Sequence, residues 1–349
     1  MHLANTSALS EMEFSHQPKN RCGDLTDNLM KSIIVYFSQT GNTKKIALSI
    51  KSGVLAACGQ CDIARLQDVE TRDLSGYDLI GLGSPVWHRR EPTNVLNFIE
   101  YNLNSMEGKQ AFVFCTHGVF PGHFIGRVVP ALRLEGLTVI GWQNWYSSCS
   151  VPEHPKPYFT DRHPDEIDLL EAVRFGREMA ERSRLIAAGE IRLTPVLPTG
   201  QAYHELYPGP GSTDRARIPH PPAAGSEVKE LIDLRSFDFK IDRQKCLYPK
   251  CTVCIDNCPT HSLNFTISPP IIRKNCDRCW FCEQICPRGA IVVEWGPIAD
   301  YVDANITDRW FKVADEAVAK GRLRRLVRPE DIGRKTPWYQ TRKPRLKLP

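Results

Sequence analysis

The spacing of the cysteines in the C-terminal third constrains this chain more than any other feature. Eight of its thirteen cysteines fall between Cys246 and Cys286. They form two runs, Cys246-x4-Cys251-x2-Cys254-x3-Cys258-Pro259 and Cys276-x2-Cys279-x2-Cys282-x3-Cys286-Pro287. An internal repeat of 28 residues relates the last three cysteines of one run to those of the other. Cysteines crowded in this way indicate a metal site rather than a disulfide framework.

Two kinds of metal site use closely spaced cysteines. Zinc knuckles contain Cys-x2-Cys pairs, but they do not account for two proline-terminated runs in tandem with no histidine at a ligand position. Iron-sulfur clusters are held by four thiolates, and three close cysteines followed by Cys-Pro are typical of them. Over about 55 residues the segment resembles the two-cluster bacterial ferredoxins, which implies two [4Fe-4S] clusters.

The resemblance also implies crossed ligation, in which the Cys-Pro cysteine of each run binds the cluster of the other run. One cluster would be held by Cys246, Cys251, Cys254 and Cys286, and its neighbour by Cys276, Cys279, Cys282 and Cys258. One departure concerns residues 247–250, because these four residues stand where the family usually has two. Whether the first run holds a complete cluster therefore requires a direct test.

The N-terminal half has the pattern of a parallel sheet. From Lys31 to about Gly141, short β-rich runs alternate with helical stretches. We expect strands at 32–37, 61–66, 77–83, 110–115 and 137–142, and helices near 43–57, 92–104 and 122–135. A further helical pattern covers 165–188, with an inward face expected at Ile167, Leu170, Val173, Met179 and Leu185. The predicted fold class is α/β, with a doubly wound five-stranded parallel sheet followed by a small α+β domain around the cysteines.

Composition divides the chain into five expected parts. They are a polar N-terminal extension (1–30), the α/β domain (31–190), a Pro/Gly-rich linker (191–235), the cysteine-rich domain (236–300) and a helix with a basic tail (301–349). The prolines and glycines of the linker are expected to prevent regular helix or sheet. Met30 stands just before the first strand and is an alternative start of the chain.

A polar loop, Ser38-Gln39-Thr40-Gly41-Asn42-Thr43, follows the first expected strand. Backbone N-H groups, hydroxyls and the positive end of a helix dipole converge there, as in a phosphate site, although such a turn is often only a helix cap. The loop lacks the Gly-x4-Gly-Lys of a Walker loop. Gly81-Leu82-Gly83 lacks the third glycine of a dinucleotide fingerprint, so neither ATP nor NAD is favoured.

Together with an aromatic-bearing loop after strand three and a glycine-bearing loop after strand four, this loop makes residues 31–185 resemble flavodoxin. The resemblance implies FMN, with its phosphate held by Ser38, Thr40, Gly41, Asn42 and Thr43. Ser84, Pro85, Val86, Trp87 and His88 would line one side of the isoalloxazine, with Trp87 stacking on it. Thr116, His117, Gly118, Phe120, Gly122 and His123 would approach its other side. Flavodoxins usually have acidic residues near the flavin, whereas His88, Arg89 and Arg90 would stabilise an anionic reduced flavin or attract an acidic partner.

The whole architecture resembles the flavodoxin-ferredoxin fusion proteins of anaerobic prokaryotes, which implies a cytoplasmic protein. A flavin takes up two electrons and each cluster carries one, so we expect electron transfer between FMN and the clusters and to or from a redox partner protein. The alternative is a flavin-dependent reductase whose small-molecule acceptor binds at His88, Arg89, Arg90, His117 and His123. Saturable turnover of a small molecule would distinguish the two. A homodimer is a further arrangement to test.

Charge is distributed unevenly along the chain. The net charge is +5, yet residues 317–349 contain eleven Lys or Arg against Glu330 and Asp331. A basic tail suits nucleic acid or an acidic protein, or it is a solvated tail that lies on its own or a sister subunit. No aromatic-interleaved nucleic-acid motif accompanies it, so nucleic acid is not expected. No apolar run approaches the roughly 20 residues that span a bilayer.

Overall fold

The computed structural model describes residues 30–69, 74–103, 105–152, 154, 156–207, 239–267, 270–303, 308–332 and 338–341. The expected N-terminal extension, most of the expected linker and the end of the basic tail lie outside the described residues. No helix in the described part of the chain is long and apolar enough to cross a membrane.

The five expected strands are present and form one parallel sheet. They are β1 (Lys31–Tyr36), β2 (Gln60–Arg65), β3 (Leu79–Pro85), β4 (Gln110–His117) and β5 (Thr138–Tyr146), arranged in the order β2-β1-β3-β4-β5. β1 pairs with both β2 and β3, so that Ser32 lies between Cys61 and Leu79. This strand order is that of flavodoxin-like doubly wound folds, and it confirms the predicted fold class.

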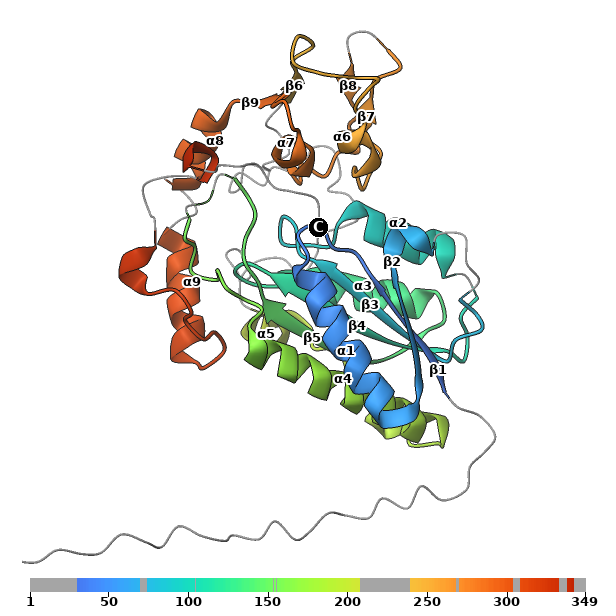
Figure 1. Ribbon diagram of the computed structural model, residues 1–349. Helices are drawn as coiled ribbons and strands as arrows, with labels where there is room; N and C mark the ends of the chain where they lie inside the picture. The colour runs from blue at the N-terminus through green and yellow to red at the C-terminus, as the bar shows by residue number, and fades with distance from the viewer. Residues whose placement is uncertain are drawn as a thin grey trace, which may run out of the picture.

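Helices cover both faces of the sheet (Figure 1). α1 (Asn42–Cys58) and α4 (Glu166–Ala187) lie on one face, and α2 (Thr93–Asn102) and α3 (Phe124–Leu134) on the other. The three central strands, β1, β3 and β4, are apolar on both sides because they contribute alternate residues to two cores. Ile34, for example, packs with the α1 and α4 side, whereas Ile33 packs with the α2 and α3 side. We call this unit the sheet domain.

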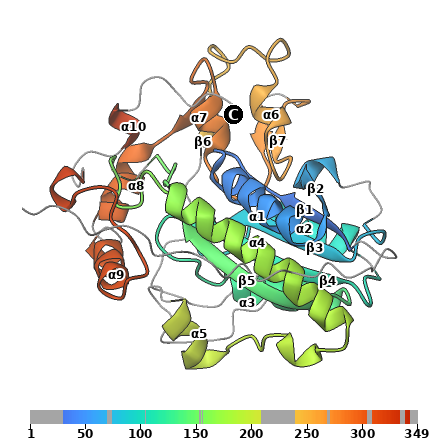
Figure 2. The same cartoon turned by 60° about the horizontal axis from the view of Figure 1, so that its bottom comes forward.

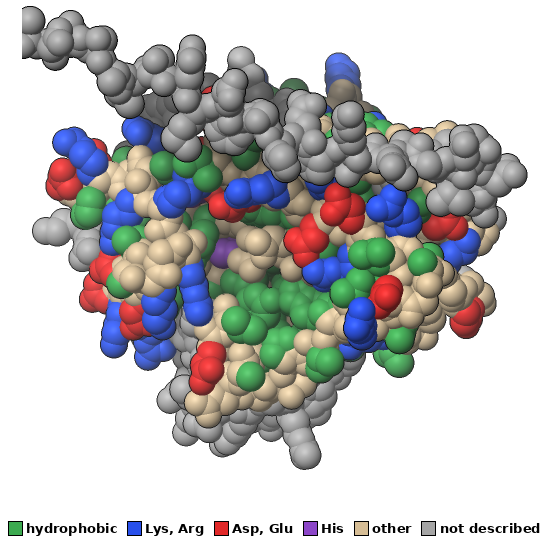
Figure 3. Space-filling view, turned by 90° about the horizontal axis from the view of Figure 1, so that it is seen from below, with side chains coloured by type: hydrophobic (Ala, Val, Ile, Leu, Met, Phe, Trp, Pro, Cys, Tyr) green, Lys and Arg blue, Asp and Glu red, His purple; other side chains and the backbone are tan. Residues whose placement is uncertain are grey.

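The expected inward face of α4 is wrong at three of its five positions. Ile167, Leu170 and Leu185 are 49, 63 and 44 % exposed. Figure 3 looks onto the underside of Figure 1, where α4 lies, and shows hydrophobic side chains exposed among charged ones. Met179 is buried as expected, together with Ala172, Phe175, Ala180 and Ile186, which were not predicted. Close packing on α1 explains the difference, because a Cβ added at Gly176 would lie 2.1 Å from the carbonyl oxygen of Ile50. The buried face is therefore the one on which Gly176 lets the backbones of α4 and α1 approach each other.

The expected linker, 191–235, begins with regular structure. It contains a short 3-10 turn (Ile191–Leu193) and helix α5 (Gly200–Leu206), which is free of proline and has its only glycine at its first residue. Tyr203 of α5 is buried; its hydroxyl donates to the Gly122 carbonyl at 2.9 Å and accepts from the Gly126 amide at 3.0 Å. The prediction from proline content was therefore wrong for this segment. The prolines stand on either side of a two-turn helix, which tertiary packing stabilises.

The cysteine-rich part consists of two similar halves. β6 (Phe239–Ile241) pairs antiparallel with β9 (Ile291–Val293), and β7 (Leu263–Asn264) pairs antiparallel with β8 (Ile271–Ile272). Short helices α6 (Val253–Asp256) and α7 (Phe281–Ile285) each carry one of the cysteines. This part lies beyond the carboxyl ends of the sheet strands (Figures 1 and 2).

After α8 (Trp295–Val302) the chain returns to the sheet domain. Helix α9 (Asp308–Ala319) buries Phe311 against Phe159, with ring centroids 5.5 Å apart, in a small core of its own. A 3-10 turn (Pro329–Asp331) and α10 (Trp338–Thr341) follow. Much of the expected basic tail is thus part of a packed structure rather than a solvated extension.

Candidate functional site

The loop after β1 has the shape of an anion site. Gly41 is the N-cap of α1 with φ of +91°, a left-handed conformation that favours glycine, and its amide donates to Ser38 Oγ at 3.2 Å. No acidic side chain occupies the first turn of α1, so nothing on the helix itself neutralises its positive end. A Cβ built on Gly41 would meet no atom within 4 Å, so the space beside the loop is open. The donors therefore fit a phosphate group.

Hydrogen bonds tie this loop to its neighbours at the edge of the sheet. The buried hydroxyl of Thr43 lies 2.8 Å from the hydroxyl of Thr116 at the end of β4. Asn42 donates from Nδ2 to the Ser148 carbonyl at 3.2 Å. The start of α1 is therefore in contact with the end of β4 and with the segment after β5, and Thr43 and Thr116, which the sequence placed around one ligand, lie side by side.

The loop after β3 is a tight turn. Trp87 and Arg90 exchange two backbone hydrogen bonds of 2.8 and 2.9 Å, and the residues between them, His88 and Arg89, have φ of 46° and 64°. The Trp87 ring is half-buried and packs edge-on against Phe37, with ring centroids 5.4 Å apart. The loop is thus rigidly placed, and the stacking role of Trp87 stays a prediction.

His117 is the most deeply buried of the four candidate catalytic residues, at 3 % exposed. Its Nε2 lies 2.8 Å from Asn144 Oδ1 and is the donor, since an amide oxygen only accepts. Nδ1 is buried and has no hydrogen-bond partner among the described residues. Burial lowers the pKa of His117 to about 4, so the ring is neutral at physiological pH and Nδ1 is an unused acceptor.

The fourth candidate, His123, connects the two loops. Its backbone amide donates to the Arg89 carbonyl at 2.8 Å, and burial followed by the charge of Arg89 lowers the pKa of its side chain. The preceding Gly122 has φ of +56°, and a Cβ there would lie 2.4 Å from the same carbonyl oxygen. Only glycine permits this close approach, which holds the loops after β3 and β4 together.

The eight cysteines of the two runs surround two cavities. Cys246, Cys251, Cys254 and Cys286 line the first cysteine cavity, together with Leu247, Phe265 and Ile291. Cys258, Cys276, Cys279 and Cys282 line the second, together with Phe239, Leu263 and Trp280. The structure thus brings together the same two groups of four that the sequence suggested, each combining both runs.

The surroundings of these thiols suit a bound cationic centre. Burial, followed by neighbouring thiols, raises the pKa of Cys254 to about 12, and burial likewise raises the pKa of Cys279 to about 12. Such thiols ionise only when a metal compensates the charge. Backbone amides point at the sulfurs, with the Ser262 amide 3.3 Å from Cys258 Sγ and the Ala290 amide 3.2 Å from Cys286 Sγ. Donors of this kind stabilise thiolates bound to iron.

Asp277, between two cysteines of the second run, joins the cysteine-rich part to the sheet domain. Its carboxylate accepts from the Thr93 amide at 2.7 Å and from the Thr93 hydroxyl at 2.5 Å. Its carbonyl lies 3.0 Å from His88 Nε2. Two residues on, Cys279 Sγ accepts from Gln39 Nε2 at 3.5 Å. The second cysteine cavity is therefore docked on the loops after β1 and β3.

Sequence reasoning missed this junction. Asp277 caps the N-terminus of α2, whose own N-cap residue, Pro92, makes no side-chain capping bond. A single acidic residue between two cysteines gives no signal of a partner 184 positions earlier in the chain. Gln39 lay inside the recognised loop but was not among the expected ligands.

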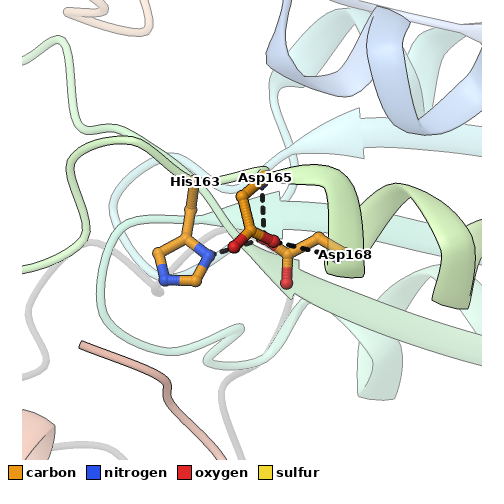
Figure 4. A group of neighbouring side chains, drawn as sticks. All are labelled: His163, Asp165 and Asp168. Carbon is orange, nitrogen blue, oxygen red and sulfur yellow. Dashed lines mark hydrogen bonds and ion pairs between the residues drawn. The ribbon is translucent and has the colours of Figure 1, made fainter. Parts of the chain in front are cut away.

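Another group of side chains could be mistaken for a metal site. His163, Asp165 and Asp168 converge so that their ligand atoms lie within 4.8 Å of one another (Figure 4). The guanidinium of Arg324 occupies the position of an ion, with Nη1 2.6 Å and Nη2 2.7 Å from the Asp165 oxygens and Nη2 2.5 Å from Asp168. The Arg324 hydrogen bond lowers the pKa of Asp165. This cluster anchors the C-terminal segment to the sheet domain.

Comparison with known proteins gives matches for both halves. A family model described as "Flavodoxin domain" matches residues 33–122. A flavodoxin of Megasphaera elsdenii is 31 % identical over 110 residues, which is 31 % of this chain and 80 % of the relative. A ferredoxin of Methanothermococcus thermolithotrophicus is 32 % identical over 56 residues, which is 16 % of this chain and 93 % of the relative. A solved flavodoxin structure from the domain Archaea is 24 % identical with a TM-score of 0.36, covering 44 % of this chain and 99 % of that one. The chain therefore belongs to the flavodoxin family through its sheet domain and to the ferredoxin family through its cysteine-rich part.

Proposed function

We propose that this protein is an electron-transfer protein, which exchanges electrons between FMN and two [4Fe-4S] clusters within one chain and then with a partner redox protein. FMN supplies a carrier of two electrons and each cluster a carrier of one, so their combination connects two-electron to one-electron chemistry. Membership of both a flavodoxin and a ferredoxin family supports this assignment.

Named residues would hold each cofactor. Ser38, Thr40, Gly41, Asn42 and Thr43 would bind the FMN phosphate, and the loops at 84–88 and 116–123 would enclose its ring. The four cysteines of each cavity would ligate one cluster. The half-buried turn at His88 and Arg89 would place positive charge and a hydrogen-bond donor beside the flavin site.

The observation that carries the proposal is the junction at Asp277. It places the second cysteine cavity against the two loops that would contact the flavin, through Thr93, His88 and Gln39. Since Asp277 is only 6 % exposed, water is largely excluded from this contact. A cluster in the second cavity would thus be the one that exchanges electrons with FMN.

The alternative, a reductase with a small-molecule site at the same loops, receives less support. His88 is engaged by the Asp277 carbonyl, and His117 is buried against Asn144. His88 Nε2 is therefore committed to an internal contact, and the unused Nδ1 of His117 is buried, whereas a substrate-binding residue needs a group that faces the substrate.

The test uses full-length protein purified without oxygen. Iron, acid-labile sulfide, zinc and released flavin are quantified per chain, and about eight iron, eight sulfide and one FMN are expected. The flavin is then reduced rapidly by a light flash in the presence of a photosensitiser and a sacrificial electron donor, and the spectral change of the clusters is followed at several protein concentrations. A rate that does not depend on concentration supports transfer within the chain.

Other results would contradict the proposal. Zinc in place of iron would refute the cluster assignment, and absent FMN would refute the flavin site. A redistribution rate proportional to protein concentration would show that the two halves react between molecules. Specific, saturable turnover of a small molecule would favour the reductase instead.

A further inference from the structure

The two halves of the cysteine-rich part have equivalent loops, of which one is docked on the sheet domain and the other is exposed to solvent. In the second run the loop between the first two cysteines is Asp277-Arg278, and it is docked on the sheet domain through Thr93 and His88. In the first run the equivalent loop is Leu247-Tyr248-Pro249-Lys250, and all four residues are exposed. The two additional residues that distinguish the first run from the family pattern therefore lie in this exposed loop.

The enlarged loop presents apolar groups next to the first cysteine cavity. Leu247 lines that cavity and is nevertheless 46 % exposed, so its side chain separates the cysteines from solvent. Tyr248 is 40 % exposed and its ring packs on Phe265, another lining residue, with centroids 5.0 Å apart. Pro287, after the last cysteine, is also exposed at the rim. Apolar contacts of this kind form the centre of protein interfaces.

Basic side chains surround this apolar centre. Lys245, Lys250 and Arg288 are exposed, and each stands within two residues of a cysteine of the first cavity. Two acidic groups lie nearby: Asp242 pairs with Lys245 at 3.2 Å, and Asp256 accepts from the Thr252 hydroxyl at 2.7 Å. The three basic side chains outnumber these two carboxylates, so the rim has a net positive charge.

Resting on the proposed function, we infer that the rim of the first cysteine cavity is the docking surface for an electron-carrier protein with an acidic patch around its redox centre. The partner would cover Leu247 and Tyr248 and place its carboxylates opposite Lys245, Lys250 and Arg288. One cluster site thus faces the flavin loops inside the molecule, and the other faces the partner outside. Electrostatic complementarity would mainly set the association rate and its dependence on salt.

The test measures binding of an acidic plant-type [2Fe-2S] ferredoxin, used as the probe, to the cofactor-loaded protein by calorimetric titration. The test variant is K245Q/K250Q/R288Q. The matched control K51Q/R174Q/R177Q removes the same charge from α1 and α4, the two helices that cover one face of the sheet (Figure 1). We expect the test variant to bind on the order of tenfold more weakly than wild type, and the control to bind as wild type does. Higher ionic strength should weaken wild-type binding more than that of the test variant.

A second readout maps the surface directly. A carbodiimide, which couples carboxylates to lysine amines, should link the probe to Lys245 or Lys250. Absent binding, equal weakening in both variants, or cross-links confined to other lysines would overturn the inference. Cofactor content and intramolecular electron redistribution are measured on the same preparations. Their failure would contradict the proposed function, whereas their persistence with unchanged binding in the test variant would contradict the docking surface alone.

Discussion

Replacing Asp277 by alanine tests the junction on which the proposed electron path depends. The substitution removes the acceptor of both hydrogen bonds from Thr93, at 2.7 and 2.5 Å, and leaves the cysteines in place. The backbone contact to His88 and the Gln39 contact to Cys279 do not involve the carboxylate and can persist. The variant therefore weakens the docking of the second cysteine cavity without removing a ligand.

The size of the effect follows from the kind of bonds that are lost. A hydrogen bond to a charged group contributes about 1.5 to 3 kcal/mol, and a carboxylate at a helix N-terminus adds a fraction of that. Thr93 is half-buried, so water can replace part of what is lost. We expect the junction to be destabilised by about 3 kcal/mol, which raises the population of its open form on the order of 100-fold.

Hydrogen exchange at the Thr93 amide measures this opening directly, because that amide is one of the two donors. Exchange should accelerate on the order of 100-fold in D277A, and electron redistribution between flavin and clusters should slow. The matched control is D256A, which removes an exposed carboxylate of the cysteine-rich part that bonds to Thr252. It should leave both measurements unchanged.

A double-mutant cycle with T93V isolates the hydroxyl bond from the amide bond. T93V alone should produce a smaller effect, and its addition to D277A should change little. If D277A leaves both the Thr93 amide exchange and the redistribution rate within a factor of three of wild type, the carboxylate does not hold the junction and the argument from it is refuted.

Three further predictions concern stability. Burial lowers the pKa of His117 to about 4, so the folded protein resists protonation of this ring. The stability that the neutral ring contributes is complete above the unfolded pKa near 6.5 and is lost as the pH falls toward 4. Between pH 7 and pH 5, the free energy of unfolding from denaturant titrations should therefore fall by about 2 kcal/mol more in wild type than in H117Q. R324M should free the C-terminal segment for limited proteolysis and cost about 1 kcal/mol, a value reduced for the partial exposure of the pair, whereas R328M, at an exposed pair, should have no effect. G176A should destabilise the sheet domain by about 2 kcal/mol, because its Cβ would meet the backbone of α1, whereas G296A, whose Cβ meets nothing within 4 Å, should be neutral or stabilising in thermal unfolding.

Patterns among residues close together in the sequence predicted most of the sheet domain and the grouping of the cysteines. The alternation of apolar runs and helical stretches located all five strands and the helices between them, since backbone periodicity and burial on both faces are local properties. Spacing within each cysteine run, with the resemblance to ferredoxins, predicted the two groups of four thiols that line the two cavities, and their role as cluster ligands stays a prediction. The loops at the carboxyl ends of β1, β3 and β4 were also brought together, because parallel strands end at the same edge of a sheet.

Local sequence patterns did not predict the contacts between segments that are far apart in the chain. The buried face of α4 depends on the close approach of α1 at Gly176, and α5 is helical because Tyr203 finds partners at Gly122 and Gly126. The Asp277 contact with Thr93, which assigns one cysteine cavity to the interior and leaves the other facing outward, joins two parts of the chain with separate sequence signatures. Periodicity and spacing describe what neighbouring residues do together, whereas the pairing of a carboxylate with a helix end far along the chain exists only once both segments have been placed in space.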